Sequence, residues 1–283
     1  MRTRLFLRTT EFLWQEGHTA HATAKEAEEE AQKILDIYRE VAEEELAIPV
    51  LTGLKTEAEK FAGAEHTYCI EAMMGDGRAL QAGTSHNLGQ KFAKAFNVTF
   101  QTQENLEEYV YATSWGVSTR LIGAIAMVQG DDKGLRLPPK VAPYQVVIIP
   151  IGKTEEDIRT VLNYLDISIK ELLTDEIRIH IDDRTGVTPG FKFNEWEMKG
   201  VPLRLEVGAR DMKEELVTIV KRDNGEKIKL NRDQIGSKIP EFLKQIQHSL
   251  FDQAKSFLDK NTFNTESYDE FRSIITDTKG FVR

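Results

Sequence analysis

The feature that most constrains the fold is a proline-rich segment near the middle of the chain. Residues 138–143 contain three of the chain's eight prolines. Proline has a fixed φ and no backbone N–H, so such a segment forms neither a helix interior nor a central strand. A chain of 283 residues is long enough for two ordinary domains. We therefore expect one domain at 1–137, a linker at 138–143 and a second domain at 144–240.

The sequence after this linker predicts a βαβ unit. Val146–Ile151 is rich in β-branched residues, a pattern typical of a strand buried on both faces. A helix is expected from Thr154 to Leu172, followed by a strand at Ile177–Ile181. Strand, helix and strand with short connections pair in parallel. Beyond this unit, strands are expected at Pro202–Val207 and Leu216–Lys221, and a long helix at Pro240–Lys260.

The first half of the chain predicts an antiparallel sheet with helices packed on it. Its clearest helix follows Thr23, because Thr23 and Glu26 form a capping box and the apolar residues up to Leu46 keep to one face. Two more helices are expected at Leu88–Phe96 and Ser118–Gln129. Short strands separated by turns are expected at Arg4–Arg8, Glu11–Gly17, Thr67–Met73, Ala79–Ser85 and Tyr109–Trp115.

Composition excludes several classes of protein. The 46 acidic and 37 basic side chains give a net charge of −9, which argues against a general nucleic-acid coat but allows a local basic patch. Cys69, the single cysteine, cannot form an intrachain disulfide or build a zinc site alone. No apolar run approaches the ~20 residues that cross a bilayer, and no secretion signal is visible. We expect a cytoplasmic protein without a membrane or metal site.

Three stretches carry more polar side chains than patterning explains. In 6–21, Arg8 stands between two expected strands, where an arginine suits a phosphate and the alternative is ordinary cross-strand ion pairing. The stretch 81–90 leads a strand into an expected helix start, which favours a small anion or simple capping. In 113–124, Arg120 lies in the first helical turn. A cation there opposes the helix dipole, and an anionic ligand would explain it.

Together, in this order, these stretches resemble the prolyl-tRNA synthetases, class II enzymes, in their archaeal and eukaryotic form. Residues 8–18 (RTTEFLWQEGH) are similar to motif 2, 83–90 (GTSHNLGQ) to the proline-pocket segment, and 115–120 (WGVSTR) to motif 3. The similarity continues through 189–202 and 206–211 and so covers nearly the whole chain. It implies a partial antiparallel class II catalytic core followed by an α/β anticodon-binding domain with a mixed five-stranded sheet.

The resemblance implies ATP-dependent activation of L-proline to prolyl adenylate, then transfer to the 3′ end of tRNA(Pro). Arginines and Mg²⁺ would stabilise the phosphate charge. The catalytic residues would be Arg8 and Arg120. The ATP-binding residues would be Arg8, Glu11, Gln81, Ser118 and Arg120, and the proline-binding residues would be Trp14, Glu16, His18, Phe92, Thr84 and His86.

For the second domain, the resemblance implies contacts with the tRNA anticodon by Lys192, Glu197, Arg204, Arg210 and Asp211. Arginine and carboxylate side chains suit the edges of guanine, which offer both acceptors and donors. The segment 184–232 holds eleven basic and eight acidic residues, a net charge of +3 within an acidic chain. Without the resemblance, an ordinary mixed-charge surface would explain this charge equally well.

The chain also departs from the family. Motif 1, which forms the homodimer interface, and part of the amino-acid pocket would lie upstream of Met1. Residues 241–283 resemble the start of the C-terminal domain, whose zinc ligands in many relatives would lie further on. We expect part of a prolyl-tRNA synthetase, a ligase whose activity requires the segment upstream of Met1. The alternatives are a catalytically incomplete fragment that only binds tRNA or ATP, and a free-standing editing protein. Motifs 2 and 3 argue against the editing protein, and the segment at 84–90 favours proline over glycine, threonine or histidine.

Overall fold

A computed structural model describes residues 2–283 of the chain. They divide into two compact units. Unit 1 comprises the residues up to Glu44, Ile48–Val128 and Lys255–Arg283, and unit 2 comprises Glu45–Ala47 and Gln129–Ala254. This division differs from the expected boundaries, because residues 138–143 lie within unit 2. Arg178 ties this segment to unit 2 by donating hydrogen bonds to the carbonyl oxygens of Pro139, Lys140 and Ala142. The functional domain boundaries stay a prediction.

The elements assigned to unit 1 come from both ends of the chain. From the N-terminal side they are β1 (Trp14–His21), α1 (Ala24–Glu40), the π-helical turn η1 (Val41–Glu45), β2 (Val50–Leu54), β3 (His66–Met73), β4 (Ala79–Gly89), α2 (Lys91–Phe96), β5 (Thr99–Gln101), β6 (Glu107–Tyr109), β7 (Tyr111–Ser118) and α3 (Arg120–Gln129). From the C-terminal side they are β13 (Thr262–Phe263), α8 (Tyr268–Ser273), η3 (Ile274–Thr278) and β14 (Phe281–Val282).

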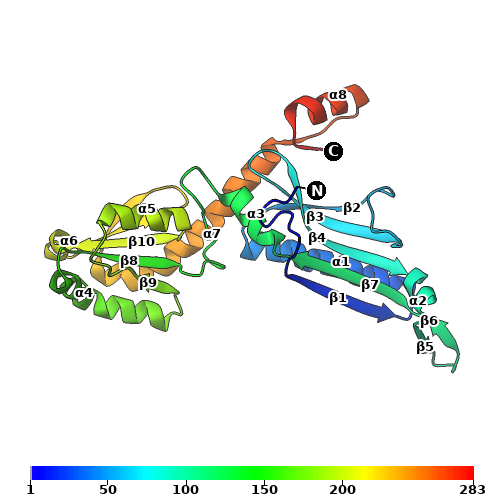
Figure 1. Ribbon diagram of the computed structural model, residues 1–283, viewed down its shortest axis with the longest axis horizontal. Helices are drawn as coiled ribbons and strands as arrows, with labels where there is room; N and C mark the ends of the chain where they lie inside the picture. The colour runs from blue at the N-terminus through cyan, green and yellow to red at the C-terminus, as the bar shows by residue number, and fades with distance from the viewer. Residues whose placement is uncertain (1) are drawn as a thin grey trace. The chain divides into compact units, whose positions relative to one another are not determined.

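A five-stranded sheet organises unit 1, in the order β1-β7-β4-β3-β2, and every neighbouring pair is antiparallel. The predicted antiparallel sheet is therefore confirmed. Helix α1 lies across one face of the sheet (Figure 1). It begins at the predicted capping box, where Thr23 and Glu26 exchange side-chain-to-backbone hydrogen bonds. Ser85 of β4 donates to the carbonyl oxygen of Ala31, so β4 and α1 are joined directly.

One carboxylate holds α1 against the sheet. Glu28 accepts hydrogen bonds from Asn87 at 2.7 Å, from Gln32 at 3.0 Å and from the Tyr68 hydroxyl, and it pairs with the His66 ring at 3.1 Å. Burial alone would raise the pKa of Glu28, but these hydrogen bonds favour the ionised form and lower the pKa to about 2. The acidic face of α1 is therefore not entirely a solvated surface.

Three local predictions in unit 1 are wrong. Arg4–Arg8 is not a strand but a tight turn, in which Phe6 has a positive φ of 57° and Arg4 and Arg8 form an isolated bridge. The second predicted strand begins later, at Trp14 instead of Glu11. The stretch 81–90 leads a strand into a helix as predicted, but α2 begins at Lys91 instead of Leu88, because β4 continues to Gly89 and pairs with β3 and β7 on both sides. Tertiary pairing here overrides the local helical signal.

Unit 2 is an α/β unit. Its elements are β8 (Val146–Ile151), α4 (Glu155–Thr174), β9 (Ile179–Ile181), α5 (Pro189–Lys199), β10 (Leu203–Gly208), α6 (Ala209–Lys213), β11 (Leu216–Lys221), β12 (Lys227–Asn231), the 3₁₀ turn η2 (Arg232–Gln234) and α7 (Ile235–Lys260), whose last turns are assigned to unit 1. The sheet order is β12-β11-β10-β8-β9, with parallel β10–β8 and β8–β9 pairs and antiparallel β10–β11 and β11–β12 pairs. The predicted mixed five-stranded sheet is confirmed.

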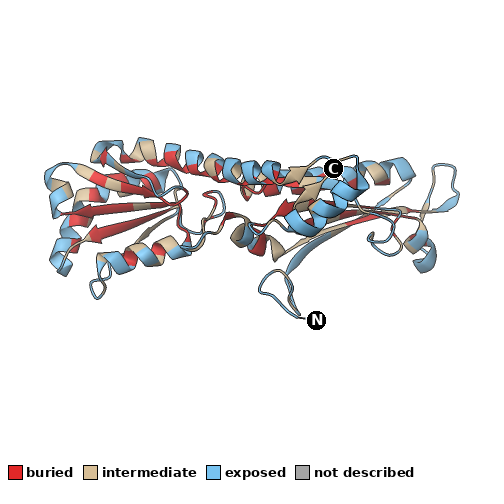
Figure 2. Cartoon of the chain, turned by 90° about the horizontal axis from the view of Figure 1, so that it is seen from above, coloured by how far each residue is buried: buried red, intermediate tan, exposed pale blue. Residues whose placement is uncertain are grey.

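The core of unit 2 confirms the reading of Val146–Ile151 as a strand buried on both faces. Val146 and Ile148 pack in one apolar cluster, and Val147 and Ile149 pack in another with Trp196. Figure 2 shows this sheet coloured as buried. The predicted start of the last long helix is wrong. Helix α7 begins at Ile235 and contains Pro240, although proline is more often found in the first turn.

Within residues 2–283, no helix is long and apolar enough to cross a membrane.

Candidate functional site

A cavity of about 260 Å³ opens on the sheet of unit 1. Its polar lining comes from four elements, because β1, β4, β7 and the first residue of α3 all contribute. Seven of the residues predicted for the ATP and proline sites line it: Trp14, Glu16, Gln81, Thr84, His86, Ser118 and Arg120. These residues span more than a hundred positions in the sequence, so the fold, not the chain order, brings them together.

A bulge in β4 explains how three of these residues share the cavity. Thr84 and His86 are two positions apart, as the alternation of a strand requires. Gln81 has the opposite parity, so a regular strand would turn its side chain to the other face. The pairing of β4 with β3 shifts between Ile70 and Glu71, where Gly83 and Gln81 are the successive partners. This extra residue changes the phase of the strand and directs Gln81 into the cavity.

The alternation of β1 places Trp14, Glu16 and His18 on one face. Glu16 and His18 are themselves paired, with 3.2 Å between the carboxylate oxygen and the ring nitrogen. Between them, Gly17 lies opposite Trp115 of β7. A Cβ at position 17 would lie 2.2 Å from the indole Nε1, so only glycine lets this ring pack across β1. Trp115 also lines the cavity.

Arg120 is held at the floor of the site by backbone oxygens. It is the first residue of α3, as expected. Its Nε donates to the carbonyl oxygen of Leu7 at 3.2 Å, and its Nη1 donates to the carbonyl oxygen of Gln81 at 3.2 Å. Neither partner is charged, and within residues 2–283 no carboxylate forms an ion pair with this guanidinium. This arrangement suits an anionic ligand.

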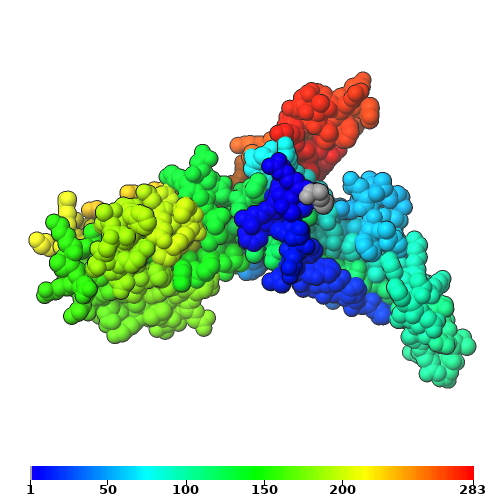
Figure 3. All heavy atoms as spheres, viewed as in Figure 1, coloured from blue at the N-terminus to red at the C-terminus, as the bar shows by residue number. Residues whose placement is uncertain are grey.

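Two predicted residues, Arg8 and Glu11, do not line this cavity. Both are exposed and precede β1, in the N-terminal segment that Figure 3 shows in dark blue on the surface of unit 1. The backbone of this turn is nevertheless close to the site, since Leu7 accepts the hydrogen bond from Arg120. The structure therefore places Arg8 one residue from a direct contact of Arg120.

His18 and Phe92 line a second, largely apolar cavity of about 490 Å³. Glu16, Ser114 and Phe61 border both cavities, so the two are adjacent. Phe61 was missed by the sequence reading. It packs against His86 with ring centroids 5.1 Å apart and against Phe92 at 6.2 Å. Its position in an irregular segment between β2 and β3 gives no periodic signal.

Lys55, which follows β2, was also missed. Its ammonium group donates a hydrogen bond to the side-chain oxygen of Gln81. It also lies near His86, whose pKa is lowered by burial and further by the charge of Lys55. His86 in turn bonds the Thr67 hydroxyl through Nδ1 at 2.9 Å. Lys55 is therefore a half-buried cation that contacts Gln81 and lies near His86, two residues that line the cavity.

Unit 2 has a cavity of its own, of about 220 Å³, and two of the predicted anticodon residues line it. Glu197 comes from the end of α5 and Arg204 from the start of β10. The rest of the charged lining is basic: Lys133, Lys221, Arg222 and Lys227. The cavity therefore combines one carboxylate with several cations, which suits a ligand that offers both a donor edge and negative charge.

The two predicted residues of this cavity are held differently. The Arg204 guanidinium donates to Glu206 at 2.7 Å and to the carbonyl oxygen of Phe193 at 3.1 Å, and it lies over the Phe193 ring. The Glu197 carboxylate pairs with Lys133 at 3.2 Å, with both side chains partly exposed. Arg204 is thus fixed in place, whereas within residues 2–283 the Glu197 carboxylate has Lys133 as its one ion-pair partner.

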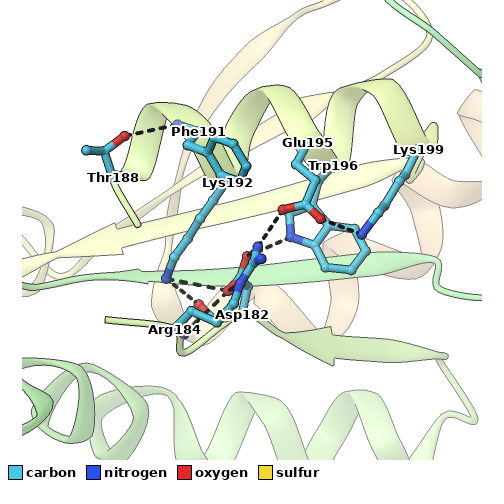
Figure 4. Close-up of polar contacts among 8 residues, drawn as sticks. All are labelled: Asp182, Arg184, Thr188, Phe191, Lys192, Glu195, Trp196 and Lys199. Atoms are coloured by element: carbon cyan, nitrogen blue, oxygen red, sulfur yellow. Dashed lines mark hydrogen bonds and ion pairs between the residues drawn. The ribbon is translucent and has the colours of Figure 1, made fainter. Parts of the chain in front are cut away.

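Lys192 does not reach this surface, and the structure corrects its expected role. It is buried, with 2% of its surface exposed, and its ammonium donates to the carbonyl oxygen of Asp182 at 2.8 Å. Figure 4 shows it pointing from α5 toward Asp182. The Asp182 carboxylate also accepts hydrogen bonds from Arg184 and from the Trp196 indole at 2.9 Å. The resemblance implies an anticodon contact for Lys192, and the sequence gives no sign of its buried partner Asp182.

Asp182 is the centre of this buried cluster. Burial would raise its pKa, but hydrogen bonds from Arg184 and Trp196 and the charge of Lys192 hold the pKa well below the usual range of an aspartate. The cluster joins the end of β9 to α5, the helix that carries Glu197. Its function visible in the structure is to fix α5 on the sheet.

Arg210 and Asp211 lie in α6, beyond the other end of β10, and do not line the cavity of unit 2. Arg210 is exposed and pairs with Glu214 at 3.4 Å. The Asp211 carboxylate accepts the backbone N–H of Gly208 at 2.9 Å, which caps the first turn of α6. The structure therefore separates the predicted anticodon residues into a cavity pair, an α6 pair and one buried lysine.

Comparison with family models assigns both parts of the chain. Residues 2–129 match the tRNA synthetase class II core domain (G, H, P, S and T), and residues 145–242 match the anticodon binding domain. The first match contains the cavity of unit 1. The second contains most of the cavity residues of unit 2.

Curated relatives are similar to the chain over its whole length. The proline–tRNA ligase of Natranaerobius thermophilus is 53% identical over 99% of this chain and 58% of its own length, and that of Chlorobaculum tepidum is 54% identical over 100% and 58%. The crystal structure of Cryptosporidium parvum prolyl-tRNA synthetase with L-proline and AMP superposes with a TM-score of 0.92 at 45% identity, covering 98% of this chain and 59% of that one. The chain is therefore homologous over its whole length to prolyl-tRNA synthetases, combines a class II core domain with an anticodon-binding domain, and spans somewhat more than half the length of these relatives.

Proposed function

We propose that this chain carries the nucleotide and proline sites of a proline–tRNA ligase, which activates L-proline with ATP and transfers it to tRNA(Pro). One observation carries the proposal: seven residues expected at these sites from four separate elements line a single cavity. Because the chain spans only part of its relatives, the activity of the whole enzyme is proposed and not deduced. The relative solved with L-proline and AMP supports the choice of ligands.

Adenylate formation depends mainly on positive groups placed around the phosphates, and it needs no side-chain nucleophile. An oxygen of the proline carboxylate attacks the α-phosphorus of ATP, the bond to the β-phosphate oxygen breaks, and pyrophosphate leaves. The uncompensated Arg120 is suited to hold the terminal phosphates, and Arg8, on the adjacent turn, the α-phosphate. Gln81 and Ser118 would contact the nucleotide, and Glu11 would approach the adenine amino group.

The proline side of the site would use the face of β1 and the second cavity. Trp14, Glu16 and His18 alternate along β1, and Thr84 and His86 lie across from them on β4. Phe92 would contribute apolar surface from α2, and we add Phe61, because it borders both cavities. An acidic group such as Glu16 matches the ammonium charge of free proline.

ATP is part of this proposal, and Mg²⁺ is the metal that the resemblance implies. Within residues 2–283, no group of three or more histidine, cysteine or acidic side chains is arranged to hold a metal ion. Mg²⁺ usually binds through substrate phosphates with few protein ligands. We assign no metal ligand in this chain, and no step proposed here depends on one.

For tRNA(Pro), we propose that unit 2 reads the anticodon through Glu197 and Arg204. Their cavity offers an acceptor and a fixed guanidinium, which match the two edges of guanine. Arg210 and Asp211 would form a separate contact on α6. Lys192 would act through the position of α5 and not by direct contact, because it is buried. A homodimer of the full-length enzyme and a cytoplasmic location belong to the same proposal.

The test is proline-dependent ATP–pyrophosphate exchange by the 283-residue chain, with histidine, threonine and glycine as control amino acids. Wherever exchange occurs, we expect it with proline alone. A nucleotide-binding fragment without catalysis is the alternative, and it would bind AMP in calorimetry without exchange. If longer versions of the protein also failed with proline but exchanged with another amino acid, the assigned substrate would be wrong.

In an active protein, Arg120→Ala should reduce exchange by roughly 100- to 1,000-fold, as expected for loss of a preorganised group that stabilises transition-state charge. Lys25→Met is a matched control, because Lys25 is a highly exposed cation whose recorded ion pair is with Glu29 on α1. It should leave exchange unchanged. An equal loss in both variants would contradict the role given to Arg120.

A further inference from the structure

We infer that Lys55 is a positioning residue of the nucleotide site, which fixes the Gln81 amide as a hydrogen-bond donor toward the cavity. This inference rests on the proposed function for the identity of the ligand. It concerns a residue that lies outside the three motif-like stretches of the sequence. Lys55 does not line the cavity itself, so it acts through the side chain of Gln81, which does.

The first step concerns the amide of Gln81. A glutamine amide can present either its oxygen or its NH₂ group to a ligand, depending on which way it is turned. Lys55 carries only donors, and its ammonium takes the amide oxygen of Gln81. The NH₂ group must then be the end left for the cavity. No other residue within 2–283 makes a recorded hydrogen bond to it, so both N–H donors are free for a ligand.

The second step concerns the ring of His86. The Thr67 hydroxyl is buried, with 2% of the residue exposed, and it accepts the backbone N–H of Phe61 at 3.0 Å. Its own proton needs an acceptor, and the His86 Nδ1 atom, 2.9 Å away, is the one recorded within the described chain. Nδ1 therefore accepts, and a neutral His86 carries its proton on Nε2.

The third step concerns charge. A second proton on His86 would place a cation near the Lys55 ammonium in a partly buried site. Burial and the charge of Lys55 both lower the pKa of His86, so the ring stays neutral near pH 7. Of the other charged groups at this cavity, Glu16 comes from β1 and Arg120 from α3. The Gln81 amide on β4 thus presents donors, which match the oxygen and nitrogen acceptors of a nucleotide, and the titration of the His86 ring reports the charge of Lys55.

The test measures AMP binding by calorimetry on the 283-residue chain and four variants. Lys55→Met removes the donor and the charge, and we expect a roughly tenfold weaker affinity, since one oriented hydrogen bond is lost. Lys55→Arg keeps both features and should stay within about threefold of the parent. Gln81→Glu keeps an acceptor for Lys55 but replaces the free NH₂ group with an oxygen, so it should bind more weakly than Lys55→Met. Lys25→Met is the matched surface control.

A second readout does not depend on any ligand. Long-range ¹H–¹⁵N spectra of the histidine rings report the tautomer and the titration of His86. We expect the Nε2–H tautomer at pH 7.5 and a higher pKa of His86 in Lys55→Met, because a neighbouring positive charge has been removed. Thermal unfolding of each variant identifies any general loss of structure.

The outcomes separate this inference from the proposed function. If the parent chain did not bind AMP, the nucleotide assignment would fail, while the histidine spectra would still decide the role of Lys55. The inference is overturned if Lys55→Met binds AMP like the parent and leaves the titration of His86 unmoved. It is also overturned if Lys55→Arg weakens binding as much as Lys55→Met, because a positioning role requires rescue by the conservative residue.

Discussion

The two units hold their charged side chains in opposite ways. In unit 2, the Asp182 carboxylate is 1% exposed and its oxygens are occupied by Arg184, Trp196 and Lys192. In unit 1, the Arg120 guanidinium is held only by two backbone carbonyl oxygens, and no carboxylate pairs with it in the described chain. The Asp182 carboxylate thus has all its partners within the cluster, whereas the charge of Arg120 is available for a ligand.

This difference shows why residue type alone does not identify a binding residue. Lys192 and Lys133 are both lysines of unit 2. Lys192 has a buried acid beside it and serves to fix α5, while Lys133 reaches the open cavity and pairs with Glu197 at 3.2 Å. The side chains that stabilise the fold of unit 2 are therefore different from those whose charge is available for recognition.

The largest effect is expected from Asp182→Asn, which would break the closed cluster. Lys192 would be left buried without its counter-charge, and breaking such a pair costs about 3–5 kcal/mol. Urea denaturation followed by circular dichroism measures this loss. Asp166→Asn is the matched control, because Asp166 forms an exposed pair with Lys170 one helical turn away. It should change the free energy of unfolding by less than about 0.5 kcal/mol. Equal losses would contradict the contrast between closed and exposed charges.

The next effect concerns recognition in unit 2. Arg204→Ala should weaken tRNA(Pro) binding by about 1–3 kcal/mol, the usual worth of a bidentate base contact. Proline-dependent pyrophosphate exchange should be spared, because the cavity of unit 1 is unchanged. Filter binding at a fixed salt concentration gives the affinity, with Lys238→Ala as an exposed basic control. Loss of exchange with unaltered tRNA affinity would show that the two sites are assigned to the wrong units.

A smaller effect is expected from pH in unit 1. The folded pKa of Glu28 is about 2, below its ordinary value of 4.5, so its contribution to stability is present above pH 4.5 and is lost as the pH falls toward 2. Allowing for partial solvent exposure, the loss between pH 5 and pH 3 should be about 1 kcal/mol larger in the parent than in Glu28→Gln. Denaturation at both pH values measures it. Parallel pH dependence in the two proteins would show that Glu28 does not hold α1.

The smallest effects should be alike in the two units. Helices α1 and α4 both begin with a threonine capping box, at Thr23 and Thr154. Replacing either threonine by alanine removes one side-chain acceptor for an N-terminal N–H and should cost about 1 kcal/mol. Thermal unfolding of Thr23→Ala and Thr154→Ala checks this equality. A threefold larger cost in one unit would indicate that its helix start does more than cap the helix.

Much of the fold was predictable because it rests on local patterns. The capping box of Thr23 and Glu26, the β-branched run at Val146–Ile151 and the parallel βαβ unit appear as predicted. Helix α5 was missed, although Thr188 followed by Pro189 is a readable helix start, with Thr188 accepting the N–H of Phe191. Strands β2 and β12 were missed because each is short, with one face exposed.

The candidate site was predictable to a lesser extent. The alternation of Trp14 and Glu16 along β1 follows from the strand period alone. The place of Gln81 depends on a bulge that forms only when β4 pairs with β3. Lys55 and Phe61 come from irregular segments, where no period marks the face of a residue.

By itself, the sequence determined the resemblance to prolyl-tRNA synthetases, the two kinds of sheet and seven of the fifteen residues that line the cavity of unit 1. These features depend on local periodicity and on short motifs, and both are visible in the sequence without knowledge of the fold. Only the tertiary structure decided that Lys192 is buried beside Asp182, that Gln81 lines the cavity and that Lys55 donates a hydrogen bond to the Gln81 amide. The physical reason is that burial and pairing are set by partners distant in sequence, and a one-dimensional pattern carries no record of them.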